Sequence, residues 1–507
     1  MKRLLAVILA VLLLCGCSHE PAYVPTGNGL DEQEATLPVL GPDQPEQAFS
    51  LTYHPEETLN PYTCADYTNR TLFSLLYQSL FVVDQDYKVE PQLCRSYKVS
   101  ADKKVYVFYP ESATFADGSR LTSADVMASL EAARTSPVYS GRLYNVTAVF
   151  LTGDGGVQVE LATAYDNLPM LLDIPILRAS QVNADFPTGT GPYCLESTAA
   201  GRWLRLRQDW WCKAKLPVSA EKIPLVNAPT ARDIRDQFEL GNVGVVCANP
   251  GADSYVDFRS DHGLWDCENG VFLYLGCRAK SNVFSNETVR RALTHAIDRD
   301  LLVRDYYRTF AKAATLPASP NSPFYNHALA AGYGFDADLF RQALVAEKLD
   351  GKTIALLVNS ADGRRTKVAQ AIADMLESCS LKVTLRALSG EEYKKALKNG
   401  NYDLHLGQTM LSPNMDLSQF FDSDGTLNYG GISDVGIFSL CQDALANQGN
   451  YTALHQAVME DAMLCPVVFL SYGVYVQPDL VTAFAPARDC IFYYSLGKEL
   501  DEILIEQ

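Results

Sequence analysis

Between Lys352 and Leu406 the chain alternates regularly between the strand period and the helix period of apolar residues. The run TIALLV is short and apolar, and the segment RRTKVAQAIADMLESC after it carries Val368, Ile372 and Leu376 at helical spacing. LKVTLRAL alternates apolar and polar residues, as a strand with one buried face does. SGEEYKKALKNG predicts a second helix, and YDLHL predicts a third strand. This β-α-β-α-β order predicts a parallel sheet with right-handed crossovers.

Two polar loops leave the strands of this unit at the same edge of the predicted sheet. NSADGRR, residues 359–365, follows TIALLV, and LGQTMLSPNMDLSQFF, residues 406–421, follows YDLHL. Ligands of open α/β sheets bind beyond the carboxyl ends of the strands, so these loops are candidates for the lining of a binding site. The alternative is that both are solvated connections.

Capping signals mark the starts of three predicted helices. Thr122 is followed by Asp125 in LTSADVMASLEAAR, and Ser389 is followed by Glu392 in SGEEYKKALKNG, so both segments carry a capping-box pattern. Asn286 is the predicted cap of SNETVRRALTHAID. Between about 46 and 270 the pattern changes to short strands such as KVYVFYP, GVQVELA and RWLRLRQD, which predict a mixed α+β region with antiparallel pairing.

The N-terminus has the features of an export signal. Lys2 and Arg3 precede an apolar run, residues 4–14, that is too short to span a bilayer as a mature helix. The sequence LCGC that ends the run resembles a bacterial lipobox, and Cys17, after Gly16, is the candidate for lipidation. Residues 1–17 are therefore predicted to be a lipoprotein signal peptide. The alternative is a plain signal peptide with an incidental cysteine.

Composition limits the classes of function. The chain has 507 residues, enough for two or three domains, and residues 18–45 are rich in Pro, Gly, Glu and Gln, as a flexible tether is. The formal charge of −18 and the absence of a basic run beyond the extreme N-terminus argue against nucleic acid as a partner. No later segment is apolar for long enough to span a membrane.

Catalytic and metal-binding motifs are missing from the sequence. It contains no HExxH, GxSxG or Walker motif, and its thirteen cysteines are scattered without CxxC pairs. TGTGPY, residues 188–193, is followed by a strand-like segment and not by a helix, so it predicts a tight turn. His405 and His295 are interpreted as structural. We therefore expect no enzyme activity, no cofactor and no metal, and mostly buried free thiols.

Several motifs, taken in order, resemble the family 5 extracellular solute-binding proteins, which serve ABC importers of peptides, nickel complexes and some sugars. ATFADGSRLTSADVMASLEAAR, PTGTGPYCLES and VRRALTHAIDRDLLV are similar to motifs of that family, and the similarity runs from about Leu59 to Ala485. The resemblance implies an α/β (mixed α+β) fold of the two-lobed periplasmic-binding-protein type, with a hinged cleft. Lobe I, with an inserted subdomain, would comprise residues 46–268 and 475–507, and lobe II residues 269–474. Strands near VFLYLG and VVFLSYGV would form the hinge.

The resemblance also implies where the ligand lies. Peptide-binding members carry an acid for the α-amino group in the loop equivalent to residues 406–421, and Leu411 stands near that position. Asn359 stands where dipeptide binders carry an arginine for the carboxylate. A buried unpaired ligand charge is costly, so a dipeptide held by ions at both ends is not expected. Asp416 could supply the acid, or could cap the helix LSQFF. The predicted ligand-binding residues are Asn359, Gln408, Thr409, Met410, Leu411, Ser412, Asn414, Asp416, Tyr274 and Tyr475.

The expected function is a monomeric receptor, lipid-anchored on the extracellular or periplasmic face of the cell membrane. It would capture an uncharged or weakly charged small molecule, or a peptide held mainly through its backbone, and deliver it to an ABC permease and its ATPase. The alternative is a ligand sensor or partner-binding module with the same fold and no role in transport. A hydrolase has no nucleophile and base to support it.

Overall fold

The computed structural model describes residues 49–199, 201–212, 220–429, 434–478, 480, 484–498, 500 and 505–506. The predicted signal peptide 1–17 and tether 18–45, with Cys17, lie outside the described residues. Residues 47–507 form one compact unit, within which the lobe boundaries given above remain a prediction. Among the described residues, no helix is both long and apolar enough to cross a membrane.

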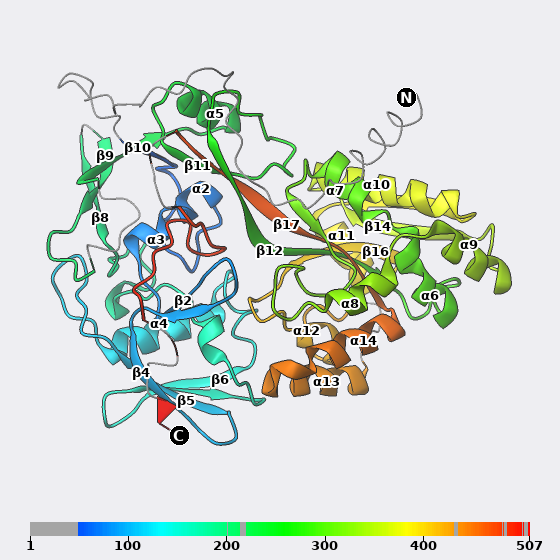
Figure 1. The fold of residues 1–507 in the computed structure, drawn as a ribbon, viewed down its shortest axis with the longest axis horizontal. Coiled ribbons are helices and arrows are strands. Elements are labelled where there is room, and N and C mark those ends of the chain that lie inside the picture. The colour runs from blue at the N-terminus through cyan, green and yellow to red at the C-terminus, as the bar shows by residue number, and fades with distance from the viewer. Residues whose placement is uncertain are drawn as a thin grey trace, which may run out of the picture. The chain divides into compact units, whose positions relative to one another are not determined.

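A mixed sheet of eleven strands runs through this unit (Figure 1). Its order is β15-β14-β16-β12-β17-β11-β1-β10-β9-β8, and β13 pairs with β17. The strands are β1 (Leu51–Tyr53), β8 (Tyr193–Thr198), β9 (Gly201–Leu206), β10 (Lys222–Asn227), β11 (Val245–Ala248), β12 (Gly263–Cys277), β13 (Ala311–Ala313), β14 (Thr353–Asn359), β15 (Lys382–Leu388), β16 (Leu404–Met410) and β17 (Leu464–Val476).

The β-α-β-α-β prediction is confirmed. Strand β14 pairs in parallel with both β15 and β16, and the connecting helices are α10 (Gly363–Ser378) and α11 (Gly390–Lys398). Val368, Ile372 and Leu376 are fully buried, because their spacing places them on the face of α10 that packs on the sheet. The capping box at Ser389 is wrong: Ser389 precedes α11, but its side chain makes no capping hydrogen bond. The next residue, Gly390, has a φ of +54°, so the chain does not enter the helix in the usual extended-to-helical way.

Two long antiparallel strands, β12 and β17, occupy the centre of the sheet and pair along most of their length (Figure 1). The pairing is interrupted between Glu268 and Phe272, where Gly270 adopts a φ of +71°. Such a conformation is accessible to glycine and strained for other residues. These are the strands that the resemblance designates as the hinge, and the interruption places an irregular backbone segment in the middle of β12.

A second sheet, of order β18-β4-β5-β7-β6, is antiparallel except for the β18–β4 pair. Together with the antiparallel pairs of β8, β9 and β10, it confirms the prediction for the first half of the chain, whereas β1 pairs in parallel with β10 and β11. Strands β2 and β3 pair only with each other and form a separate two-stranded sheet. The strands are β2 (Phe81–Val83), β3 (Val89–Pro91), β4 (Cys94–Val99), β5 (Val105–Pro110), β6 (Val146–Leu151), β7 (Val157–Leu161) and β18 (Ile505–Glu506).

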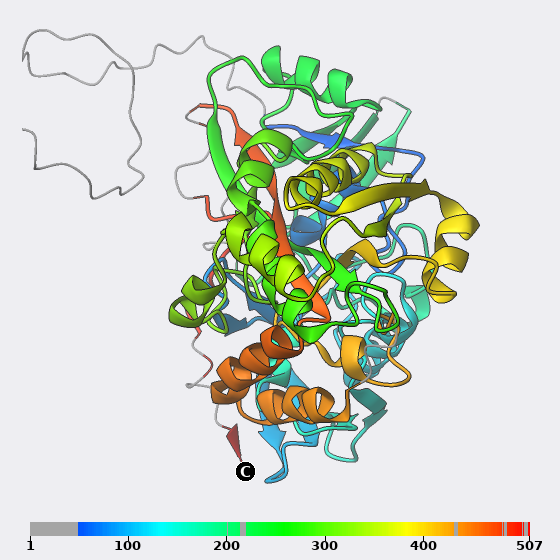
Figure 2. The same ribbon diagram turned by 90° about the vertical axis from the view of Figure 1, so that its right-hand side faces the viewer.

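Helices cover the sheets, and the last two, α13 and α14, pack against each other (Figure 2). The capping box of Thr122 with Asp125 at the start of α4 and the cap at Asn286 before α6 are both confirmed. The α-helices other than α10 and α11 are α2 (Tyr67–Arg70), α3 (Phe73–Leu76), α4 (Ser123–Thr135), α5 (Ala231–Glu239), α6 (Glu287–Leu293), α7 (Arg299–Tyr306), α8 (His327–Ala330), α9 (Ala337–Ala346), α12 (Ser418–Phe421), α13 (Val435–Ala446) and α14 (Tyr451–Asp461).

TGTGPY is a bend that leads directly into β8, so no helix N-terminus is available there. Its glycines serve close packing: a Cβ at Gly189 would lie 2.1 Å from the carbonyl oxygen of Leu76, and one at Gly191 would lie 2.4 Å from the carbonyl carbon. Ten of the eleven described cysteines, all except Cys212, are free thiols, and none of the eleven is exposed. Their predicted role as buried thiols is therefore confirmed for the part of the chain that is described.

Candidate ligand-binding cleft

Four cavities adjoin one another beside β12 and β17. Arg488 lines three of them, and Asn269, Met410 and Tyr472 each line two. Since shared residues connect the cavities, we treat them as one candidate cleft with four compartments. The residues that line it come from segments as far apart in sequence as α2 and the region that follows β17.

The first compartment, the α10 cavity, has a volume of about 430 Å³. It lies at the carboxyl ends of β14 and β16, beside the N-terminus of α10, where the strand order predicts a ligand. Its walls come from the segment after β11, from the middles of β12 and β17, and from the loop after β14. The lining residues are Asn249, Gly251, Ala252, Asp253, Ser254, Asn269, Val271, Tyr307, Ala361, Asp362, Gly363, Arg364, Gln408, Leu470 and Tyr472.

Asp253 brings the two sides of the α10 cavity together. Its carboxylate lies 3.0 Å from the ammonium of Lys367 and 3.9 Å from Nε of Arg364, both of which are on α10. A Cβ at Gly363 would lie 1.9 Å from the Asp253 carboxylate, so only glycine permits this approach. The segment after β11 and helix α10 therefore meet at one wall of the cavity.

The second compartment, the loop cavity, has a volume of about 260 Å³ and lies under residues 409–427. Opposite this loop stands the segment after α4, and Gln419 Nε2 donates a hydrogen bond of 3.2 Å to the Gly141 carbonyl. Tyr144 donates a hydrogen bond to Asp422 in the same region. The lining residues are Pro137, Val138, Gly141, Arg142, Thr409, Met410, Leu411, Ser412, Asp416, Gln419, Thr426, Leu427 and Arg488.

The other two compartments flank Arg488. The tyrosine cavity, of about 40 Å³, is lined by Tyr67, Arg70, Thr71, Phe73, Tyr139, Pro175, Asn269, Met410, Tyr472, Arg488, Asp489 and Ile491. The Glu268 cavity, of about 360 Å³, is lined by Val83, Asp84, Gln85, Asp86, Tyr87, Asp173, Asp266, Cys267, Glu268, Asn321, Pro413, Pro486, Ala487 and Arg488. The cleft is thus acidic on one side of Arg488 and rich in tyrosine on the other.

Two arginines and two aspartates form a largely buried ionic cluster between these compartments, and the partly buried Arg70 lies near it. Arg142 bonds to Asp173 and, at 2.7 Å, to Asp489, while Nε of Arg488 lies 3.6 Å from Asp489. Burial opposes the ionisation of Asp489, but the guanidinium groups of Arg142, Arg488 and Arg70 outweigh it and hold its pKa well below the ordinary value. Burial, aided by the negative charge of Asp489, raises the pKa of Asp173.

Arg488 is held by the backbone of the predicted binding loop. Its Nη2 donates a hydrogen bond of 2.5 Å to the carbonyl of Leu411. The guanidinium also occupies the space beside Gly270, where a Cβ would lie 2.2 Å from its Cζ. The interruption of β12 and the loop after β16 therefore position the same side chain.

Six predicted residues line the cleft. Gln408 lines the α10 cavity, and Thr409, Met410, Leu411, Ser412 and Asp416 line the loop cavity. Asp416 accepts hydrogen bonds of 2.8 and 2.6 Å from the backbone and hydroxyl of Ser418, the first residue of α12, but the N-cap position of that helix is Leu417 and not Asp416. Burial raises its pKa, and these two hydrogen bonds oppose the shift.

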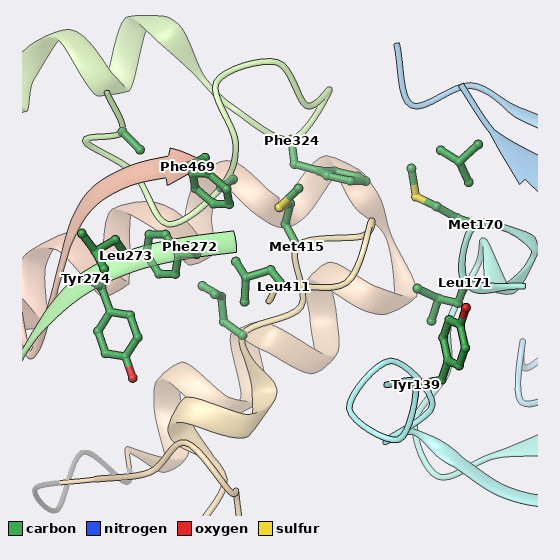
Figure 3. Packing of buried hydrophobic residues seen from close by; sticks show 14 of the residues in the cluster. Tyr139, Met170, Leu171, Phe272, Leu273, Tyr274, Phe324, Leu411, Met415 and Phe469 are labelled. Atoms are coloured by element: carbon green, nitrogen blue, oxygen red, sulfur yellow. The ribbon is translucent and has the colours of Figure 1, made fainter. Parts of the chain in front are cut away.

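Leu411, the residue near the place of the family's acid, is almost completely buried. It belongs with Met415, Phe272 and Phe324 to the large hydrophobic cluster of the molecule (Figure 3). Its carbonyl, and not a charged group, is what the loop presents to Arg488. This position therefore supplies packing on one side and a hydrogen-bond acceptor on the other.

The other four predicted residues lie outside the linings of these compartments. Tyr274 is buried behind β16 and packs edge-on against His405 and Phe420. Tyr475 is buried, and its hydroxyl lies 2.7 Å from the hydroxyl of Tyr255. The other two are also engaged within the protein: the Asn359 side chain accepts a hydrogen bond from the backbone of Ala361, and the carbonyl of the buried Asn414 accepts one from Tyr451.

Sequence reasoning missed Arg70, Arg142, Asn269, Tyr472 and Arg488. They occur singly, in five separate segments, and although Tyr472 lies in the predicted hinge strand VVFLSYGV, no local pattern marks any of them as a cleft residue. Contacts such as Arg142–Asp489 join residues 347 positions apart. A single sequence carries no local signal for such a pair, because only the completed sheet brings the segments together.

Cys247 lies beside Tyr67, a residue of the tyrosine cavity. Burial raises the pKa of Cys247 to about 12, so the thiol beside the hydroxyl of Tyr67 stays protonated and is a poor nucleophile. Among the residues that the structure describes, no three His, Cys, Asp or Glu side chains are grouped as a metal site. Polar groups converge with tyrosines around connected cavities of the size that small ligands occupy.

Comparisons with known proteins place the chain in a family. The description "Bacterial extracellular solute-binding proteins, family 5 Middle" matches residues 88–429, about two thirds of the chain, and the protein belongs to this family. A nickel-binding protein NikA of Staphylococcus aureus is 23% identical over 401 residues, which is 74% of this chain and 77% of that protein. A glutathione-binding protein GsiB of Pectobacterium atrosepticum is 27% identical over 288 residues, 53% of this chain and 55% of that protein.

A solved structure shares the fold. The structure of NikA from Brucella suis in complex with Fe(III)-EDTA matches with a TM-score of 0.69 and 19% identity, and the match covers 87% of this chain and 97% of that one. The predicted fold, a mixed α/β periplasmic-binding-protein fold of the family 5 type, is thereby confirmed. Such proteins bind solutes and are not catalytic as a family.

Proposed function

We propose that the protein is a lipid-anchored receptor that captures a small solute or a short peptide in the cleft and delivers it to an ABC import permease. The observation that carries the proposal is the row of connected cavities whose walls come from both predicted lobes. Residues up to Glu268 and from Tyr475 onward form one side, and residues 269–474 form the other. A ligand that contacts both sides stabilises the closed arrangement by those contacts.

Specific residues have distinct roles in this proposal. Gln408, Thr409, Met410 and Ser412 contact the ligand from the loop side of the cleft. Tyr274, Asn414 and Tyr475 support the walls from behind, and Asn359 shapes the loop that leads to α10. The relatives that bind nickel or glutathione show two kinds of cargo in the family, and both are small enough for the cavities described here.

A thermal-shift screen of the purified extracellular region tests the receptor function. At a ligand concentration one hundred times Kd, stabilisation should be about 2.7 kcal/mol, which raises the melting temperature by a few degrees. The screen should include short peptides, glutathione, sugars, amines and metal chelates. If no compound of any class raises the melting temperature, the receptor function is contradicted.

The lipid anchor is a separate part of the proposal and rests on Cys17. Two acyl chains on this residue hold a protein stably on a membrane. In a bacterial host that processes lipoproteins, the chain should incorporate radiolabelled palmitate and sediment with membranes, and Cys17→Ser should do neither. Equal membrane association of the two forms would contradict the anchor.

A further inference from the structure

The two predicted lobes touch each other on two sides of the cleft, and the contacts on these sides differ in kind. On the α13 side, Lys103 and residues 163–171 meet α13 and the loop after β16. On the α10 side, residues 249–258 meet α10 and the turn between α7 and β13, residues 307–310. We call residues 249–258 the α10 lid, because five of them line the α10 cavity.

The α13 side is held together by buried apolar side chains. Met170 and Leu171 follow β7 in the first predicted lobe and are almost completely buried. They belong to one hydrophobic cluster with Leu411 and Met415 of the loop after β16 (Figure 3). Separating the lobes here would expose these side chains to water, which the hydrophobic effect opposes.

Hydrogen bonds to the end of α13 add to this contact. The backbone N–H of Asp166 donates a hydrogen bond of 3.2 Å to the carbonyl of Leu445. The ammonium of Lys103 donates one of 3.1 Å to the carbonyl of Ala446 and lies 3.6 Å from the Asp166 carboxylate. The last carbonyls of a helix have no acceptor role within the helix, so the first predicted lobe supplies partners that α13 itself lacks.

The contacts of the α10 lid with the second predicted lobe are polar and lie near the surface. Asp253 pairs with Lys367 at 3.0 Å, and their side chains are 42% and 61% exposed. Asp257 pairs with Arg308, and their side chains are 67% and 43% exposed. Exposed ion pairs contribute little to stability and are screened by salt, so these contacts are weaker than those of the α13 side.

The hydrophobic side chains of the α10 lid pack onto its own lobe. Tyr255 and Phe258 lie against a small cluster of buried residues near α5 and β11, and the Tyr255 hydroxyl lies 2.7 Å from that of Tyr475. The buried members of this cluster are Phe238, Val243, Val246 and Tyr475. Of the residues that the structure describes, no member of the cluster comes from 269–474. Apolar burial in this cluster therefore ties the lid to the first predicted lobe and not to α10.

The turn that contacts the lid is strained. Arg308 and Thr309 have φ values of +52° and +70°, a left-handed conformation that is uncommon outside glycine and least favourable for a β-branched residue. Strain of this kind persists where surrounding contacts impose it, and it is concentrated at functional and switching segments. The guanidinium of Arg308 lies 5.0 Å from the ring centre of Tyr255 in the lid, and Tyr307 lines the α10 cavity. The strained turn is thus both a wall of the cavity and a contact of its lid.

We propose that the cleft opens on the α10 side alone. The α10 lid moves away from α10 and from the turn at Arg308, whereas the α13 side stays packed and forms the fixed edge. Ligands then enter and leave through the α10 cavity. The inference goes beyond the proposed function, because a receptor that opened on both sides would serve that function equally well.

Distances between spin labels across each side test this movement without any ligand. Labels carried by a non-natural amino acid leave the native cysteines in place, and pulsed electron paramagnetic resonance gives the distance distribution at low and at high salt. One pair spans the α10 side, from α5 to α10, and the other spans the α13 side. The labelled positions, all exposed, are Arg232 with Gln370 and Ala101 with Asn447.

Two matched charge reversals separate the sides. Asp253→Lys replaces an attraction by a repulsion from Lys367 and Arg364, and Lys103→Glu does the same toward Asp166 on the α13 side. The proposal predicts that Asp253→Lys, or high salt, shifts the α10-side distance to longer values, whereas the α13-side distance keeps one short value. Lys103→Glu should change neither distance and should lower the melting temperature, because the apolar contact remains while a partner of α13 is lost.

Three results would each overturn the one-sided opening: lengthening on both sides together, lengthening on the α13 side alone, or the same α10-side distance in wild type and Asp253→Lys. The receptor function would stand in all three cases, because the thermal-shift screen tests it separately. If no compound binds in that screen while the α10-side distance responds as predicted, the receptor function is wrong and the movement stands.

Discussion

At the scale of single residues, Arg488 is the side chain that connects the compartments of the cleft, because it lines three of the four. Its guanidinium fills the space left by the missing side chain of Gly270, bonds to the Leu411 carbonyl and approaches Asp489. None of these relations is visible in the sequence, because the three partners belong to three distant segments. The neutral residue Leu411, in contrast, could be singled out by comparison with the family's motif.

Gly270→Ala should disturb this arrangement. The new Cβ would lie 2.2 Å from Cζ of Arg488, and the φ of +71° would become strained. We expect a loss of about 2–4 kcal/mol in the free energy of unfolding and weaker ligand binding. The matched control is Gly351→Ala, which has the same φ of +71° and no atom within 4 Å of the new Cβ. Equal losses for the two variants in urea unfolding would show that Arg488 does not fill this space.

His455 should make stability depend on pH. It is fully buried in α14, and burial lowers its pKa from 6.5 to about 4. The unfolded chain therefore takes up this proton near pH 6.5 and the folded protein only near pH 4, so this residue lowers stability as the pH falls through that window. The expected cost at pH 5 is about 2 kcal/mol. His455→Phe should show less loss between pH 8 and pH 5, and identical pH profiles would contradict the account.

At the scale of elements, β16 passes from the core into the cleft along its length: its first four residues are buried, and the last three are not. Leu404 and Leu406 are fully buried, whereas Gln408 and Met410 are exposed and line cavities. The pattern YDLHL was sufficient to predict this strand and its direction. The sequence did not show that the strand continues to Met410, since LGQTM lacks a regular apolar alternation and the pairing with β12 extends it.

Two substitutions in β16 should therefore affect different properties: one should lower the stability of the fold, and the other should weaken ligand binding. Leu406→Ala should lower the free energy of unfolding by about 2–5 kcal/mol, because it opens a cavity in the core. Met410→Ala should change it by less than about 1 kcal/mol, because the side chain is 45% exposed, and should weaken ligand binding. The measurements are denaturant unfolding and ligand titration of both variants. A large loss of stability in Met410→Ala with unchanged binding would show that Met410 is a core residue.

At the scale of the whole molecule, β12 and β17 carry the chain between the two sides of the cleft (Figure 1). Local patterns predicted the β-α-β-α-β unit, the antiparallel first half and most helix starts, because those depend on neighbours within one element. They could not predict the ionic cluster or the compartments, which form only where distant segments meet. Family motifs indicated the fold, and the fold then showed which side chains line the cavities.

A crystal structure of the protein with the tightest-binding peptide or solute from the screen tests the central claim most directly. The account predicts ordered ligand density in contact with Arg488, Met410 and Tyr472, with residues from both sides of β12 and β17 around it. An ordered ligand bound elsewhere, with the four compartments empty in the same crystal, would contradict it.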